Sequence, residues 1–160
     1  MRWQGKLPDD GFEPEGEEHW RRRQDALGIG DPGETLQPHE IEFYERFTTT
    51  NRVRLIPRDV LTFLPTSDFV WLDNDKLVIE LKTSTPDYGT IKRAIAKAVR
   101  KTQDRPGADP KRNFMVNIRN SELAPGLAER LAEMNLKADR YKIERLFVYT
   151  CGEVVEIALL

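Results

Sequence analysis

The sequence is poor in cysteine and has no long apolar run, and these two shortages limit the class of protein. Cys151 is the only cysteine, so no disulfide can form within the chain. No apolar stretch approaches the roughly 20 residues of a membrane-spanning helix. The first residues, MRWQGKLPDDG, lack the apolar core of a signal peptide. With 160 residues, 39% of them hydrophobic, the chain is expected to form one globular domain.

Histidine is also scarce, and the two present do not combine with Cys151 into a cluster of metal ligands. Cys151 precedes Gly152 in a predicted turn and has no activating base near it in the sequence, so a nucleophilic role is not expected. His39 projects to a different side of its helix from Glu40. We interpret it as a surface or capping histidine, with a general base as the alternative.

Charge is nearly balanced over the whole chain but not along it. The net charge of −2 argues against a protein that binds nucleic acid by bulk charge alone. Residues 1–46 carry 6 Lys+Arg and 12 Asp+Glu, a balance of −6, whereas residues 89–119 carry 9 and 2, a balance of +7. This asymmetry predicts a local anion-binding surface, although solvated helix faces also carry such charges.

The hydrophobic patterns predict an α/β fold with the element order α-β-β-β-α-β followed by α-β-β. Residues 1–37 are expected to form a polar arm with a short helix over 15–27, and residues 38–160 the folded domain. The expected elements are a helix over 38–49, a strand over 52–56, a hairpin over 67–84, a helix over 90–103, a strand over 113–118, a helix over 125–135 and a hairpin from strands 145–150 and 153–158.

The hairpin Ser67–Ser84 is the stretch around which the rest is arranged. Asp68 is expected to open its first strand and residues 73–75 to form the turn. Side chains alternate along a strand, so Glu80 and Lys82 should share a face about 6.6 Å apart, with Asp68 close to them across the turn. Two carboxylates and an ammonium on a rigid apolar ribbon can bind a divalent cation and orient a water.

Glu40 falls within the apolar arc of the helix that begins at Pro38. A carboxylate on an inward face is costly unless it is paired or binds a cation, so Glu40 is predicted to reach the hairpin site. The alternative is that Glu40 only favours the helix N-terminus through the helix dipole.

Two further groups are candidates for binding phosphate. The helix over 90–103 has an apolar stripe and an opposite basic side that could lie against a phosphate backbone. Thr83 and Ser84 add hydroxyls at the end of the hairpin, with simple strand-end polarity as the alternative. The basic residues are Arg93, Lys97, Arg100 and Lys101.

The spacing D-x11-E-x-K from Asp68 to Glu80 and Lys82 resembles the PD-(D/E)xK nuclease superfamily, and so does the element order from Pro38 to Ile118. Ser67 stands where that superfamily often has proline. The resemblance implies a restriction-endonuclease-like αβββαβ core with a mixed central sheet flanked by helices. It also implies hydrolysis of phosphodiester bonds with a divalent metal.

The succession PHEIEFYERF, SDFVWLDNDKLVIELKT, an Ile/Ala-rich helix ending in Gln103, and NFMVNI resembles the C-terminal toxin domains of contact-dependent growth inhibition and other polymorphic toxin proteins of bacteria. This resemblance implies a ribonuclease, with tRNA as the favoured substrate, that is blocked by a cognate immunity protein. It also implies delivery as part of a larger secreted toxin and action in the cytoplasm of a target bacterium.

The resemblance assigns roles to the site residues. Asp68, Glu80 and the main-chain carbonyl of Leu81 would hold the metal, and Glu40 would contribute directly or through water. Hard oxygen ligands favour Mg²⁺, with Mn²⁺ as the alternative. Lys82 would stand beside the attacking water or the developing negative charge.

The sequence leaves two other interpretations open. The first is a DNA endonuclease that uses the same residues, since a contact to the 2′-hydroxyl of RNA has no fixed motif. The second is an inactive nucleic-acid-binding module with the same fold. Cleavage assays on RNA and plasmid DNA distinguish the DNA endonuclease from a ribonuclease. A metal-binding titration distinguishes the inactive module from a metal-dependent enzyme.

Overall fold

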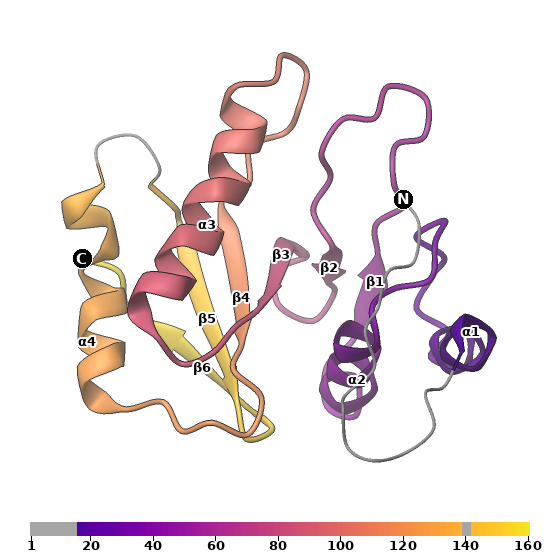
Figure 1. The fold of residues 1–160 in the computed structure, drawn as a ribbon, viewed down its shortest axis with the longest axis horizontal. Coiled ribbons are helices and arrows are strands. Elements are labelled where there is room, and N and C mark those ends of the chain that lie inside the picture. Colours follow the sequence, from indigo (N-terminus) through magenta and orange to yellow (C-terminus); the bar gives the residue numbers. More distant parts are fainter. Residues whose placement is uncertain (1–15, 139–141) are drawn as a thin grey trace.

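The computed structural model of the protein describes residues 16–138 and 142–160, so expectations that fall on residues 1–15 and 139–141 lie outside the described residues. The described chain forms helices and the strands of one sheet (Figure 1). In chain order the elements are α1 (Glu17–Ala26), α2 (Pro38–Phe47), β1 (Val53–Leu55), β2 (Phe69–Trp71), β3 (Leu77–Thr83), α3 (Tyr88–Gln103), β4 (Asn113–Asn117), α4 (Pro125–Ala132), the 3-10 turn η1 (Met134–Lys137), β5 (Arg145–Thr150) and β6 (Glu153–Ile157).

The six strands form one mixed sheet in the order β1-β2-β3-β4-β5-β6. Strands β1, β2 and β3 are antiparallel to one another, β3, β4 and β5 run parallel, and β6 returns antiparallel beside β5. Helix α3 connects the parallel strands β3 and β4, as parallel neighbours require a crossover. The α/β class and the predicted order of elements are therefore confirmed.

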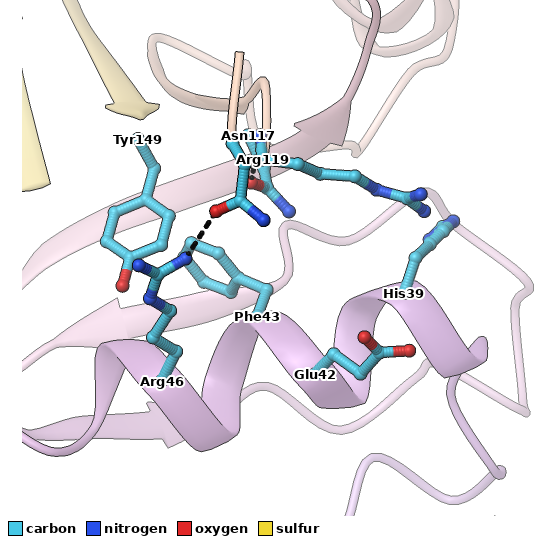
Figure 2. Close-up of a pocket in the computed structure, with 8 residues that line it drawn as sticks. His39, Glu42, Phe43, Arg46, Asn117, Arg119 and Tyr149 are labelled. Carbon is cyan, nitrogen blue, oxygen red and sulfur yellow. Dashed lines mark hydrogen bonds between the residues drawn. The ribbon is translucent and has the colours of Figure 1, made fainter. Parts of the chain in front are cut away.

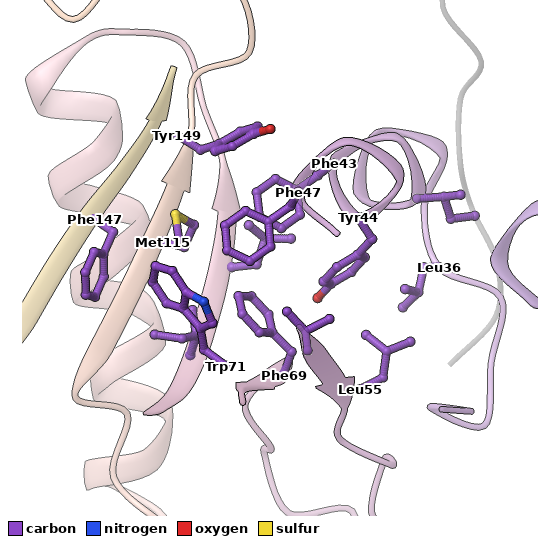
Figure 3. Packing of buried hydrophobic residues seen from close by; sticks show 14 of the residues in the cluster. Leu36, Phe43, Tyr44, Phe47, Leu55, Phe69, Trp71, Met115, Phe147 and Tyr149 are labelled. Carbon is purple, nitrogen blue, oxygen red and sulfur yellow. The ribbon is translucent and has the colours of Figure 1, made fainter. Parts of the chain in front are cut away.

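The two faces of the sheet carry different cores. The face toward α2 is rich in aromatic side chains (Figure 3), with Phe43 and Phe47 of α2 packed against Phe69 and Tyr149 of the strands. The opposite face packs aliphatic residues of α3 and α4, such as Ile91 and Leu131, against Phe114, Val116, Leu146 and Val148. Trp20 and Leu36 belong to the aromatic core, so residues 16–37 include segments that pack against α2 and its neighbours.

Local sequence explains where several elements begin and turn. Gln37 and Glu40 form a reciprocal capping box at α2, with Pro38 at the first turn. Asp87 caps α3 by accepting a hydrogen bond from the Thr90 N–H. The β5–β6 turn consists of Cys151 (φ 50) and Gly152 (φ 81), the left-handed pair of a tight two-residue hairpin loop.

Most predicted boundaries differ from the structure by one or two residues, and two of the differences bear on the site or the packing. Asp68 was expected to open the first hairpin strand, but β2 begins at Phe69, and Asp68 precedes it with its carboxylate bonded to the backbone of β3. The helix predicted over 125–135 ends at Ala132, and a 3-10 turn over Met134–Lys137 continues the coil. No helix among the described residues combines the length and apolar character needed to cross a membrane.

Candidate functional site

The predicted site lies on β3, toward the carboxyl end of the strand. Glu80 and Lys82 pair with Phe114 and Val116 of β4, and paired residues of neighbouring strands share a face. Because Phe114 and Val116 pack against α3, Glu80 and Lys82 also lie on the α3 side of the sheet. The predicted alternation of the hairpin is therefore confirmed.

Glu80 is buried and holds two ammonium groups. Its Oε2 atom lies 2.9 Å from the Lys111 Nζ and 3.1 Å from the Lys82 Nζ. The side chain of Glu80 is 5% exposed and that of Lys111 is 7% exposed, whereas Lys82 is 30% exposed. The Glu80–Lys111 pair is thus an internal ion pair, and its geometry matters because each buried charge depends on the other.

The second carboxylate, Asp68, is fixed by the backbone of the same strand. Its Oδ2 atom accepts a 2.7 Å hydrogen bond from the Leu81 N–H, and its Oδ1 atom lies 3.3 Å from an Arg58 Nη2. Burial, followed by the charge of Glu80, raises the pKa of Asp68 to about 8, although Arg58 opposes the shift. Without a further cation, Asp68 therefore tends to hold a proton at neutral pH.

Arg58 joins Asp68 to a third carboxylate. Its Nε donates to the Glu34 Oε1 at 3.1 Å while its Nη2 reaches Asp68. Glu40 lies near this group, because the charges of Arg58, Glu34 and Glu80 all affect its pKa, which burial raises above the usual value. The Oε1 atom of Glu40 also accepts a 3.1 Å hydrogen bond from the Gln37 N–H, so Glu40 both caps α2 and faces the acidic group.

A cavity of about 520 Å³ opens beside these carboxylates, and we call it the site cavity. Asp68, Glu80 and Lys111 line it, together with the end of α3 and the loop 59–66. Its charged lining residues are Glu34, Arg58, Asp59, Asp68, Glu80, Lys101, Arg105 and Lys111. On the loop, Phe63 is 74% exposed and lines the cavity, so an apolar rim stands next to a charged floor.

Of the basic residues of α3 that were predicted to contact nucleic acid, only one lines the site cavity. Lys101 lines it, and all four basic residues predicted on α3 are exposed. Arg93, Lys97 and Arg100 are not among the lining residues. Thr83 has a buried hydroxyl with no hydrogen-bond partner among the described residues, and the Ser84 Oγ donates to the Thr85 carbonyl at 2.8 Å.

Sequence reasoning missed three residues of the site: Glu34, Arg58 and Lys111. Arg58 follows the strand predicted over 52–56, and Lys111 precedes the strand predicted over 113–118. Each lies in an irregular segment, where no periodicity predicts which way a side chain points. Strand alternation gives no signal for Lys111 either, because it lies an odd number of positions before Phe114, the β4 partner of Glu80.

The donor set is compatible with a hard divalent cation. Glu80 keeps its Oε1 atom buried with no hydrogen-bond partner among the described residues. The Ile79 carbonyl accepts from the Asp68 N–H, and because carbonyls alternate along a strand, the Leu81 carbonyl points to that same side. Within residues 16–138 and 142–160, no group of three or more His, Cys, Asp or Glu side chains forms a metal-binding cluster. Such an ion would therefore draw on Asp68, Glu80 and a main-chain oxygen.

Comparisons with known proteins add no family to this description. A scan of family models, a search of curated proteins and a search of solved structures each found no match.

Proposed function

We propose that this chain is a metal-dependent endonuclease of the PD-(D/E)xK type, and that it hydrolyses RNA. The observation that carries the proposal is the pair Asp68 and Glu80, which line the site cavity with Lys111, while Lys82 contacts Glu80. The element order α-β-β-β-α-β and the mixed sheet support it, since that core positions the same residue types in this superfamily.

Asp68, Glu80 and the Leu81 carbonyl would hold the metal ion. A bound Mg²⁺ would supply Lewis-acid polarisation of the phosphate and a water of lowered pKa. For its part, the protein fixes Asp68 through the Leu81 N–H, so that one carboxylate is pre-oriented before substrate arrives. The raised pKa of Asp68 means that this carboxyl must lose its proton to become a ligand, and binding is therefore expected to strengthen as pH rises.

Two lysines stand where a cation can stabilise the transition state. Lys82 is the residue that the motif predicts, but Lys111 is the one that lines the site cavity, and both contact the same Glu80 oxygen. A fixed ammonium in a water-poor site stabilises developing phosphoryl charge better than one in bulk water. Both lysines are therefore candidates for this role, and single substitutions separate them.

The mouth of the site cavity suits a single-stranded polynucleotide segment. Lys101 and Arg105 place positive charge along the lining for phosphates. The exposed ring of Phe63 offers a face on which an unstacked base can stack. RNA loops present such unstacked bases, which favours tRNA among the substrates that the sequence resemblance implies.

The biological role proposed here follows the same resemblance. The chain would act as the toxic domain of a larger delivered protein in the cytoplasm of a competing bacterium, and a cognate immunity protein would neutralise it. An acidic partner surface would complement the basic lining residues Lys101 and Arg105. Binding there would exclude RNA from the site cavity.

Cleavage assays with a near-isosteric variant test the activity. Purified protein is incubated with total bacterial RNA and with plasmid DNA, each with Mg²⁺, with Mn²⁺ and with chelator. Asp68→Asn keeps an acceptor for the Leu81 N–H but removes the ligand charge. Asp73→Asn is the matched control, because Asp73 also accepts a backbone hydrogen bond, from the Arg52 N–H at 3.1 Å, but in the β2–β3 turn.

Metal-dependent RNA fragments that Asp73→Asn produces and Asp68→Asn does not would support the proposal. Cut plasmid with intact RNA would replace RNA by DNA as the substrate. Cleavage by a folded Asp68→Asn protein, or in chelator, would refute the metal site. Failure to cut any substrate with either metal would leave a nucleic-acid-binding module as the better description.

A further inference from the structure

A second cavity, of about 260 Å³, lies between α2 and the carboxyl ends of β4 and β5 (Figure 2). Helix α2 contributes His39, Glu42, Phe43 and Arg46, and the remaining lining residues are Asn117, Arg119, Asn120 and Tyr149. No residue lines both this cavity and the site cavity. We call it the arginine cavity, and nothing in the proposed nuclease chemistry uses it.

Its two guanidinium groups have no carboxylate partner within the described chain. Arg46 donates from Nη1 to the Asn120 Oδ1 at 2.9 Å, which is a neutral acceptor. Arg119 makes no side-chain ion pair with the described residues, whereas Arg58, Arg112 and Arg145 each have at least one. Glu42 lines the cavity too but pairs with neither arginine, so the lining keeps an excess of positive charge.

The backbone at Arg119 adopts a conformation that is rare for a residue with a side chain. Its φ is +58°, in the left-handed region. Asn117, which is 4% exposed, holds this turn by accepting a 3.0 Å hydrogen bond from the Arg119 N–H. Figure 2 shows the result, with the Arg119 side chain extending across the cavity toward His39. Such a conformation persists only where its surroundings fix it, so the backbone of Arg119 is held in place at the edge of the cavity.

His39 also lines the cavity, and one of its ring nitrogens is unsatisfied within the described chain. Its Nδ1 is buried and has no hydrogen-bond partner within the described residues. Burial, followed by the charge of Arg119, lowers the pKa of His39 below its usual value. A buried polar nitrogen without a partner is costly, and the cost is removed when a ligand oxygen or a water accepts its hydrogen.

From this arrangement we infer that the arginine cavity binds a phosphate group, held by Arg46 and Arg119 with a hydrogen bond from His39. Guanidinium groups match phosphate oxygens in geometry and charge. Tyr149 and Phe43 are almost fully buried, so they form the floor and offer no ring face to a base. The ligand is therefore the phosphate itself, supplied either as a small phosphate ion or as the backbone of a bound polynucleotide.

The ionisation of His39 reports on occupancy without any need for catalysis. The pKa of His39 is measured by NMR in the full chain, in the Asp68→Asn background, with chloride, with inorganic phosphate and with a short oligoribonucleotide that lacks terminal phosphates, at equal ionic strength. The other charged or titratable residues that line the cavity are Glu42, Arg46, Arg119 and Tyr149. His19 is the only other histidine and serves as the internal reference.

Phosphate in the cavity should raise the pKa of His39 by about one unit or more over its value in chloride, and leave His19 unchanged. Arg119→Asn, which removes the charge but tolerates a left-handed φ, should lose most of this rise relative to its own chloride value. Arg112→Gln is the control, because Arg112 is exposed and paired with Glu144. It should keep the rise.

A rise with inorganic phosphate assigns the cavity to small phosphate ligands, and a rise with the oligoribonucleotide alone assigns it to the backbone of the substrate. Identical His39 pKa values in all three solutions would overturn the inference. A rise that survives in both Arg119→Asn and Arg46→Gln would do so as well. Since Asp68 lies outside the arginine cavity, a failed nuclease assay leaves this result interpretable.

Discussion

The two cavities hold charge in opposite ways. In the site cavity, Asp68 contacts Arg58 and the buried carboxylate of Glu80 contacts Lys111, so each acid has a basic neighbour within the fold. In the arginine cavity, Arg46 and Arg119 remain without carboxylate partners among the described residues. The difference teaches where a substitution acts. Changes in the site cavity should alter the stability of the fold together with activity, and changes to the arginines should alter ligand binding with little effect on stability.

The largest effect is expected for Glu80→Ala. This substitution leaves the buried Lys111 ammonium without its partner, and breaking a buried pair in this way costs about 3–5 kcal/mol. Lys82 is partly exposed and can turn to water. Urea unfolding measures the loss. The double variant Glu80→Gln/Lys111→Met should recover most of it, and a double variant as unstable as the single one would contradict the internal ion pair.

The next effect is on the pH dependence of stability. The pKa of Asp68 rises from 3.8 to about 8 on folding, so the folded state binds the extra proton between these values. The contribution of Asp68 is therefore full below about pH 4 and is lost as pH rises through about 8, with a slope of up to about 1.4 kcal/mol per pH unit. Glu40 contributes with the same sign, because its pKa is also raised.

Unfolding in chelator at several pH values between 5 and 8.5 checks this slope. Asp68→Asn should flatten it and leave the smaller contribution of Glu40. Equal slopes for the wild type and Asp68→Asn would show that Asp68 is already ionised throughout, and that its carboxylate is not crowded by Glu80.

A smaller effect is expected at the edge of the arginine cavity. Gly152 has a φ of +81°, and an added Cβ would lie 2.6 Å from an Arg46 nitrogen. Gly152→Ala should therefore cost about 1–2 kcal/mol in backbone strain and displace the Arg46 guanidinium. Gly126→Ala is the matched control, because an added Cβ in α4 meets nothing within 4 Å. Thermal unfolding gives the change in melting temperature of each variant relative to the wild type, and the two changes should differ in sign or clearly in size. Equal melting temperatures would contradict the close approach of Arg46.

The smallest effect is a difference in RNA affinity between variants of two neighbouring lysines of α3. Lys101→Gln should weaken RNA binding a few-fold and reduce the salt dependence by about one phosphate contact, because Lys101 lines the site cavity. Lys97→Gln, one turn earlier and outside the lining, should change either quantity less. Fluorescence titrations at several salt concentrations in the Asp68→Asn background measure both. Equal losses would move the RNA path onto the whole exposed face of α3.

The parts of the fold that the sequence predicted are those with a local period. Alternation placed Glu80 and Lys82 on one face, and the 3.6-residue pattern placed the stripe of α3, since both depend on a few neighbouring residues. Arg58 and Lys111 escaped prediction because their contacts depend on the path of irregular segments through space. The arginine cavity was not predicted for the same reason, since its walls come from α2, β4 and β5. The left-handed turn at Arg119 also has no sequence signature.

The Glu80–Lys111 contact also affects the register in which strands β3 and β4 pair. Strands β3 and β4 are parallel and distant in sequence, so apolar side chains alone would permit them to meet one residue out of step. Such a slip would turn Glu80 to the aromatic face and separate its charge from Lys111. Because an unpaired buried charge is so costly, misaligned pairings are strongly disfavoured. The ion pair thus favours the observed register of β3 and β4 over pairings shifted by one residue.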